Sequence, residues 1–261
     1  MKAKKSLGQN FLIDSDIINK INLSINASSN DLIIEIGPGM GALTKFLKTK
    51  NANLICYEID KDMQPYLNKF VDDKTKIIYE DILKTNIEED IKNINFDKLY
   101  IVGNLPYYIT TSIIKFLISK NLPIDKMIFM VQDEVANRFT ANEGSKDYGS
   151  ISLYLKYYFN LEKLFKVSKY SFRPVPKVES AIIKLSKRLN KPILNEEKYF
   201  NLINDSFSMK RKTLKNNLKQ YDFNKIKKVL DKYNLPENVR AEEISEYVFI
   251  EIYESLCEEN R

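Results

Sequence analysis

Short apolar runs alternate with longer amphipathic stretches from residue 31 of this 261-residue chain. Five of the runs read as buried strands, and they cover residues 32–37, 54–59, 76–79, 99–103 and 127–132. The stretches between them have helical periodicity, as in 111–119, where apolar side chains form one face. Because parallel strands need long crossover connections, usually helices, this alternation predicts an α/β fold whose parallel sheet carries helices on both faces.

The pattern changes in the second half of the chain. Residues 152–159 and 178–185 are strand-like without a long helix between them, so we expect them to form an antiparallel edge that closes the sheet. Beyond Pro192 helical periodicity takes over, at 196–207, 209–219, 223–233 and 241–256. We therefore expect an α/β domain over residues 1–190 and a small all-helical domain over 191–261.

The residue types that the chain lacks exclude several kinds of active site. It has no histidine, which excludes Ser-His-Asp and Cys-His catalysis and histidine metal sites. Its two cysteines, Cys56 and Cys257, are too few for a disulfide framework and suit a reducing compartment. The N-terminus lacks the apolar run of a signal peptide, and no stretch approaches a membrane span. We expect a cytoplasmic protein without a resident metal.

Charges are grouped along the chain although the net charge is only +6. Residues 161–191 and 208–232 each contain nine basic and two acidic residues, whereas 237–261 contain eight acids and two arginines. Such basic clusters point to a polyanion partner, nucleic acid above all, and the alternative is a lysine-rich solvated face. The acidic end either pairs with the basic segment or limits nonspecific RNA binding.

Three of the seven glycines, Gly37, Gly39 and Gly41, lie within five residues, directly after the first expected strand and before a helix. Glycine there permits a tight turn and lets the backbone approach a nucleotide-like ligand at the start of the helix. With Ala42 the run also satisfies the G-x-G-x-x-A dinucleotide pattern. The alternative is a strand-to-helix turn without a ligand.

Acidic residues follow the next two expected strands. Glu58 and Asp60 end the second strand, about twenty residues after the glycines, where a carboxylate can accept two hydrogen bonds from a ribose diol. Asp81 follows the third strand, where it could accept from an adenine amino group. Each acid could instead cap a helix. Together they predict a site for an adenosine-containing cofactor, of either the nicotinamide or the S-adenosylmethionine type.

The segment GNLPYYIT, residues 103–110, follows the fourth expected strand. Asn104 offers an amide oxygen that accepts and an amide nitrogen that donates, while Pro106 fixes the turn. Tyr107 offers a flat face on which a base can stack. An acceptor, a nearby carbonyl and an aromatic plate are what an exocyclic base amine needs. The alternative is an ordinary Asn-Leu-Pro turn.

Taken in order, these motifs resemble a known family. NLPY after a G-x-G-x-G turn resembles the signature of amino-group N6-adenine methyltransferases, and the whole chain is similar to the ribosomal RNA adenine dimethyltransferases (the KsgA family). Further segments that carry the resemblance are 4–12, 57–60, 80–82, 171–181, 207–218 and 239–245. The resemblance implies an α/β fold with a Rossmann-like class I S-adenosylmethionine-dependent methyltransferase sheet and a small helical C-terminal domain.

The resemblance also implies roles for individual residues. S-adenosylmethionine, the methyl donor, would be held by Asn10, Leu12, Gly37, Gly39, Glu58, Asp81 and Asn104. The target amine would meet Asn104 and the carbonyls of Leu105 and Pro106, and the adenine ring would lie against Tyr107 and Phe172. RNA phosphates would be bound by Lys210, Arg211, Lys212 and Lys215. The family's usual Gln-Arg pair is Met209-Lys210 here, which keeps most of the charge but not the bidentate geometry of arginine.

The implied activity is dimethylation of the N6 amines of two adjacent adenines. The family's targets lie in the 3′-terminal hairpin loop of small-subunit (16S) rRNA within an immature ribosomal subunit, and its members act as monomers with a role in subunit biogenesis. Three alternatives stay open: an Erm-type enzyme acting on large-subunit rRNA, an assembly factor whose binding matters more than its catalysis, and a nicotinamide oxidoreductase. The run FRPVPKV and the segment VRAEEIS favour the small-subunit family.

Overall fold

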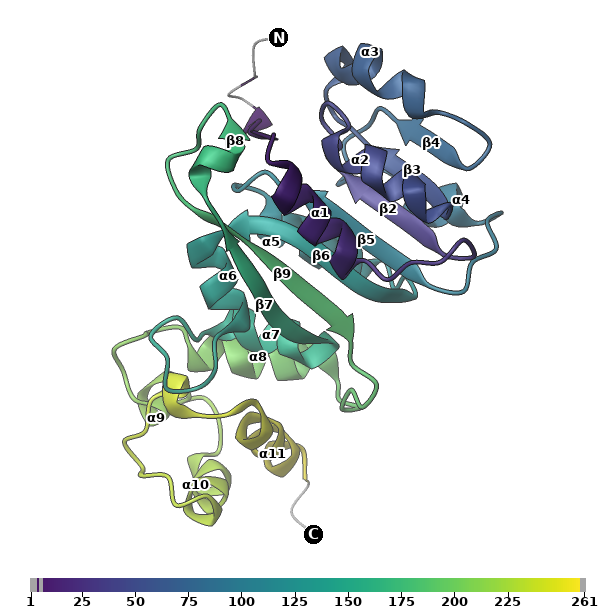
Figure 1. Ribbon diagram of the computed structural model, residues 1–261. Coiled ribbons are helices and arrows are strands. Elements are labelled where there is room, and N and C mark those ends of the chain that lie inside the picture. Colours follow the sequence, from purple (N-terminus) through teal and green to yellow (C-terminus); the bar gives the residue numbers. More distant parts are fainter. Residues whose placement is uncertain (1–3, 5–6, 259–261) are drawn as a thin grey trace. The chain divides into compact units, whose positions relative to one another are not determined.

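The computed structural model describes Lys4 and residues 7–258, which form two compact units (Figure 1). The sheet unit comprises the chain up to Ala136 together with Glu162–Lys187. The helical unit comprises Asn137–Leu161 and the chain from Arg188 onward. The helical unit thus includes residues 137–161, which the expected boundary at 190 assigns to the α/β domain.

A seven-stranded sheet in the order β4-β3-β2-β5-β6-β9-β7 organises the sheet unit. The strands are β2 (Leu32–Ile36), β3 (Asn53–Tyr57), β4 (Thr75–Ile78), β5 (Leu99–Asn104), β6 (Ile124–Gln132), β7 (Phe159–Val167) and β9 (Ser180–Lys187). Neighbours from β4 to β6 pair in parallel, and β9 pairs with β6 in the antiparallel direction. The five predicted parallel strands are confirmed, as is the antiparallel strand predicted at 178–185.

The strand predicted at 152–159 is wrong, because this segment is the helix α7 (Ser150–Tyr158). Leu153 and Tyr157, one helical turn apart, both lie in the apolar core of the helical unit. Leu155 is also buried, so apolar residues alternate with partly exposed ones in a pattern that mimics a strand. The seventh strand of the sheet is β7, which begins at Phe159 where the helix ends.

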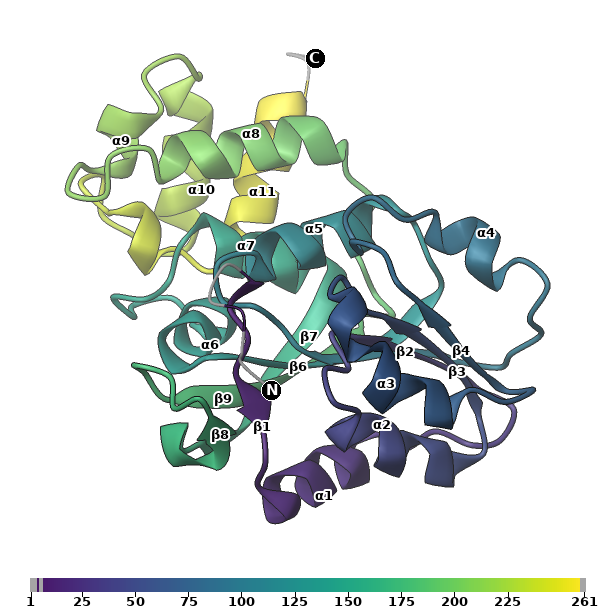
Figure 2. The same cartoon turned by 90° about the horizontal axis from the view of Figure 1, so that it is seen from above.

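Helices cover both faces of the sheet, as predicted (Figure 2). On one face lie α1 (Ser15–Ser24) and α2 (Ala42–Leu47), and on the other lie α4 (Ile87–Ile91) and α5 (Thr110–Ser119). The core beneath α1 contains Ile18 and Ile21 together with side chains of β2, β3, β5 and β6. A short ladder of β1 (Phe11–Leu12) with β8 (Phe172–Arg173) ties the N-terminal segment to the same unit. The remaining helices are α3 (Gln64–Leu67) and α6 (Asp133–Thr140).

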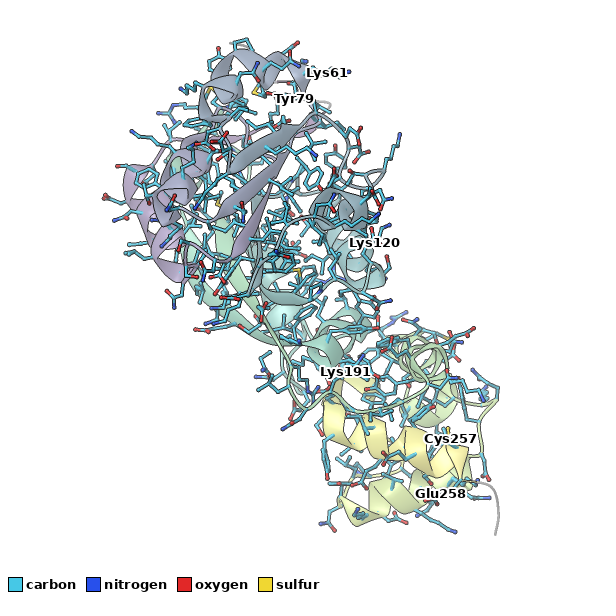
Figure 3. The ribbon with its side chains drawn as sticks, turned by 90° about the vertical axis from the view of Figure 1, so that its right-hand side faces the viewer. Lys61, Tyr79, Lys120, Lys191, Cys257 and Glu258 are labelled. Carbon is cyan, nitrogen blue, oxygen red and sulfur yellow. The ribbon has the colours of Figure 1, made fainter. Side chains whose placement is uncertain are left out.

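Four helices after residue 195 build the rest of the helical unit: α8 (Glu196–Ser206), α9 (Leu214–Asn217), α10 (Phe223–Lys232) and α11 (Glu246–Cys257). Each begins where a polar side chain caps it, at Asn195, Thr213, Asp222 and Ser245. These caps make α9 shorter than the predicted 209–219 and start α11 later than the predicted 241. The ammonium group of Lys191, labelled in Figure 3, lies over the rings of Tyr157 and Tyr158.

Within Lys4 and residues 7–258, no helix has the length and apolar character needed to cross a membrane. The same part of the chain contains no group of three or more His, Cys, Asp or Glu side chains that could hold a metal ion.

Candidate active site

A cavity opens at the carboxyl edge of the parallel strands. Because β2, β3, β4 and β5 run in the same direction, the residues that follow them meet at this edge. Most of the predicted site residues line the cavity: Asn10, Leu12, Gly37, Gly39, Glu58, Asp81, Asn104, Leu105, Pro106 and Tyr107. The fold therefore brings together the three motifs that the sequence identified separately.

The glycine turn between β2 and α2 forms the floor of this cavity. Gly37, Gly39 and Gly41 have φ angles of 69°, 56° and 82°, a region that residues with a side chain rarely adopt. A Cβ atom at Gly41 would also lie 2.3 Å from a ring carbon of Phe70. The turn therefore needs glycine at these positions, and Gly37 and Gly39 line the cavity.

Glu58 lies at the end of β3 with only 5% of its surface exposed. Its Oε2 accepts from the Gly39 N–H at 2.9 Å and its Oε1 accepts from the Asp60 N–H at 2.9 Å. Burial raises the pKa of this carboxyl group, against the lowering effect of the two backbone donors. A carboxylate has about four acceptor positions. Glu58 can therefore brace the glycine turn and still accept from a ribose diol.

The other two acids, Asp60 and Asp81, have different surroundings in the structure. Asp60 turns to the N-terminal segment, where its carboxylate accepts from Lys4 Nζ at 2.6 Å and from Gln9 Nε2 at 2.7 Å. Asp81 lines the cavity, and its Oδ1 accepts from the Leu83 N–H at 3.0 Å. Glu58 and Asp81 thus line the cavity, whereas Asp60 does not and is bound to the N-terminal segment.

Asn104 ends β5, and its amide is oriented by the N-terminal segment. Its Nδ2 donates to the backbone oxygen of Asn10 at 2.9 Å, which uses one of its two N–H groups and fixes the direction of the amide oxygen. The Pro106 oxygen accepts from Ile109 N–H and from Thr110 Oγ1, both at 3.2 Å. Since a carbonyl has two lone pairs, both acceptor positions of the Pro106 oxygen are already used.

The aromatic residues do not all lie where the sequence predicts. Tyr107 lines the cavity, and its hydroxyl is 2.8 Å from Ser180 Oγ on β9. Phe172 instead is fully buried in the apolar core, paired with Leu12 across the β1–β8 ladder. Tyr108 also lines the cavity and is 64% exposed, and sequence reasoning missed it. The doubled tyrosine after the proline was its only signal.

Glu35, in the middle of the apolar strand β2, is a second residue that sequence reasoning missed. It lines the cavity but is only 2% exposed, and its Oε2 accepts from Thr44 Oγ1 at 2.7 Å. Its other neighbour is the thiol of Cys56, 3.6 Å away, a cysteine buried as predicted. Burial raises the pKa of Glu35 to about 7, despite the hydrogen bond from Thr44. The sequence signal that could have identified Glu35 is an acidic residue within an otherwise apolar strand.

The raised pKa of Glu35 predicts a change of stability with pH. Below its ordinary pKa of 4.5 the carboxyl is protonated in both folded and unfolded chains. Between 4.5 and about 7 only the unfolded chain ionises freely, so folding loses stability, by up to about 3 kcal/mol. Glu35→Gln should remove this loss, so urea unfolding should show the variant gaining stability relative to the wild type from pH 5 to pH 8. A constant difference would contradict the account.

The basic segment of the helical unit is partly neutralised by its own unit. Lys215 pairs with Glu237 and Lys232 pairs with Glu251. Lys210 donates to the backbone oxygen of Lys146 at 2.8 Å. These pairs favour the first of the two interpretations of the acidic end, that it pairs with the basic segment.

The loop before α9 presents the other two predicted RNA-binding residues. Arg211 and Lys212 are exposed there. The buried side chain of Asn217 donates to the backbone oxygens of Ser206 at 2.6 Å and Met209 at 3.3 Å, which fixes the start of this loop.

Comparison with known proteins finds similarity over the whole chain. Residues 1–258 match the family described as ribosomal RNA adenine dimethylase. The ribosomal RNA small subunit methyltransferase A of Mycoplasmopsis pulmonis (strain UAB CTIP) is 44% identical over 259 residues, which cover 98% of this chain and 100% of that protein. The protein of the same name from Staphylococcus aureus (strain JH9) is 40% identical, with coverage of 96% and 89%.

Solved structures agree with the fold. A dimethyladenosine transferase from Plasmodium falciparum superimposes with a TM-score of 0.77 and 26% identity, over 93% of this chain and 95% of that one. The 23S rRNA methyltransferase ErmE superimposes with a TM-score of 0.76 over 95% and 100% of the two chains. At 22% identity, the second likeness concerns the fold alone.

Proposed function

Because the chain belongs to the ribosomal RNA adenine dimethylase family, we propose that it methylates the N6 amines of two adjacent adenines in the 3′-terminal hairpin loop of small-subunit rRNA. The observation that carries the proposal is the amide of Asn104, held at the same cavity edge as Glu58 and Asp81. The names of the relatives at 40% and 44% identity support the small subunit over the large one as the source of the substrate.

The cavity suits S-adenosylmethionine, which supplies a sulfonium methyl group that is already activated. Glu58 would accept from the ribose hydroxyls and Asp81 from the adenine amine of the cofactor. The backbone at Gly37 and Gly39 allows the close approach that such a ligand needs. Asn10 and Leu12 form part of the opposite wall. No side-chain nucleophile or metal is required for this chemistry.

The residues of the NLPY motif would prepare the target amine. The lone pair of an adenine N6 is delocalised into the ring, so the nitrogen is a poor nucleophile. If Asn104 Oδ1 and the Leu105 carbonyl each accept one N6 hydrogen, the nitrogen becomes pyramidal and its lone pair points to the methyl group. This stabilisation is greatest in the transition state. Tyr107, held through Ser180, would stack on the base, and Tyr108 would cover its exposed edge. The released proton can pass to water.

RNA binding would rest on exposed cations of the helical unit that bind phosphates. Each phosphate neutralised on a single strand adds roughly 0.7 to the slope of log K against log salt. We therefore expect the double variant Arg211→Ala/Lys212→Ala to weaken binding to small-subunit rRNA and to reduce this slope by about 1.4. Lys215→Ala should have a smaller effect, because Lys215 is already paired with Glu237. Filter binding from about 50 to 300 mM salt would measure both, and equal slopes for the wild type and the double variant would contradict this role.

The target is tested by offering labelled S-adenosylmethionine with unmethylated small ribosomal subunits and, in parallel, with protein-free large-subunit RNA. We expect dimethyladenosine from the small subunit alone. Methyl label in the large-subunit RNA would indicate an Erm-type activity instead. Tight binding to small subunits with no transfer to either RNA would make the protein an assembly factor. In each case digested nucleosides are identified by mass.

A further inference from the structure

One wall of the cofactor cavity comes from the N-terminal segment rather than from the sheet. Residues 7–12 line the cavity, facing the glycine turn and the end of β3. We call Lys4 together with residues 7–12 the N-terminal strap. Its position means that a ligand at the carboxyl edge of the sheet lies between the sheet and the strap.

The C-terminal end of the strap is anchored through its backbone. Phe11 and Leu12 pair with β8, and the Asn10 oxygen accepts from Asn104 Nδ2. This backbone pairing does not depend on which side chains the strap carries, and it links the strap to the rest of the sheet unit. The far end of the strap has no such ladder within the described residues and depends on side chains.

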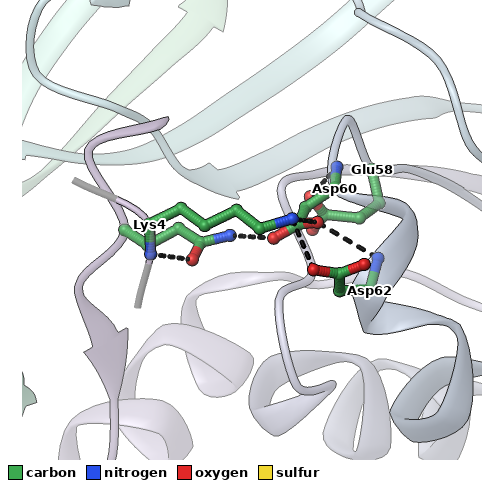
Figure 4. Close-up of polar contacts among 5 residues, drawn as sticks. Lys4, Glu58, Asp60 and Asp62 are labelled. Carbon is green, nitrogen blue, oxygen red and sulfur yellow. Dashed lines mark hydrogen bonds and ion pairs between the residues drawn. The ribbon is translucent and has the colours of Figure 1, made fainter. Parts of the chain in front are cut away.

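Those side chains converge on Asp60 (Figure 4). Lys4 Nζ is 2.6 Å from Asp60 Oδ1 and 2.5 Å from Asp62 Oδ2, and Gln9 Nε2 donates to Asp60 Oδ2 at 2.7 Å. Gln9 in turn accepts from the Lys4 N–H at 2.8 Å through its Oε1. Lys4, Gln9 and Asp60 therefore form a closed set of hydrogen bonds, which we call the clasp.

The clasp is asymmetric in its exposure to water. The Asp60 side chain is 1% exposed, whereas that of Lys4 is 40% exposed. A buried carboxylate depends on its donors, and charge-assisted bonds of this kind are stronger than neutral ones. Since the Asp60 N–H donates to Glu58, the clasp also lies two residues from the carboxylate that faces the cavity.

We propose that Asp60 is a positioning residue that fastens the N-terminal strap across the cofactor cavity through Lys4 and Gln9, and that the clasp opens whenever the cofactor is exchanged. The inference rests on the proposed function, in which successive methyl transfers require the spent cofactor to leave. Asp60 does not touch the reacting atoms. Its effect is on how long the cofactor stays bound.

Release of S-adenosylhomocysteine, followed by stopped-flow fluorescence competition with the full-length chain, tests the proposal. In Asp60→Asn the amide nitrogen would face the donors of Lys4 or Gln9, and in Lys4→Met the charged donor is removed. We expect both variants to release the ligand at least about 10-fold faster than the wild type, as the removal of one charged hydrogen bond implies. Lys4→Arg should restore slow release. Lys227→Met, which removes an exposed pair with Asp231 in the helical unit, is the matched control and should release at the wild-type rate.

A second readout separates positioning from damage to the fold. With saturating S-adenosylmethionine, the single-turnover rate of methyl transfer should stay within about twofold of the wild type in Lys4→Met, while KM for the cofactor rises. If Asp60→Asn does not fold, Lys4→Met decides alone, because the Lys4 side chain is 40% exposed and lies outside the apolar core. Release rates within twofold of the wild type in the folded variants would overturn the clasp and leave the proposed function intact. A wild type that binds no S-adenosylhomocysteine would overturn both.

Discussion

Replacing Asn104 with alanine is expected to slow methyl transfer to small subunits by at least about 100-fold, the usual effect of removing one group that stabilises developing charge. The amide oxygen would no longer accept an N6 hydrogen, and the bond from Nδ2 to the Asn10 oxygen would be absent as well. The affinity for RNA should change little, because it rests on cations of the helical unit. Single-turnover transfer and filter binding measure the two quantities separately.

The exposed Asn95 provides a matched control for this variant. Asn95→Ala makes the same chemical change on the surface of the sheet unit and should transfer methyl groups at the wild-type rate. If Asn104→Ala retained more than a tenth of the wild-type rate, the NLPY motif would not be the place where the amine is prepared.

Glu58→Gln is expected to weaken binding of S-adenosylhomocysteine by about 10- to 100-fold, the equivalent of one or two hydrogen bonds to a charged group. Both carboxylate oxygens of Glu58 accept from backbone N–H groups, of Gly39 and Asp60. An amide would place its own N–H₂ against one of these donors, which disturbs the glycine turn, and it would offer the ribose one acceptor fewer. Isothermal titration calorimetry measures the change.

Glu80 is the control for Glu58, because it is an exposed acid that also lines the cavity. Glu80→Gln should change the dissociation constant by less than about threefold. Equal effects of the two substitutions would mean that general charge, rather than the geometry of Glu58, attracts the ligand.

The order of elements and most of the site could be predicted from the sequence because both depend on local patterns. Parallel strands bring their carboxyl ends to one edge, so the residues after four apolar runs were bound to meet. The same reasoning failed at 152–159, where burial on more than one side of α7 produces alternation in a helix. Periodicity shows which residues are buried, but it does not show whether one neighbouring element or several elements bury them.

Two of the expected site residues have other partners in the structure, for a similar reason. The resemblance places Phe172 against the adenine ring, whereas the structure buries it in the apolar core, where it pairs with Leu12 across the β1–β8 ladder. Pro106 was expected to offer a free carbonyl, but the first turn of α5 uses it. The partners of Asp60 come from the distant N-terminal segment. Those of Glu35 come from helix α2 and from the neighbouring strand β3. Such neighbours follow from tertiary packing, which no local pattern in the sequence contains.

The most direct test of the account is a crystal structure of the protein with S-adenosylhomocysteine. The account predicts the ligand in the cavity at the carboxyl edge of the sheet, with its ribose hydroxyls at Glu58, its adenine amine at Asp81 and its sulfur on the side of Asn104. A ligand bound elsewhere, or one whose ribose lies away from Glu58, would contradict the assignment of this cavity as the place where the cofactor and the target base meet.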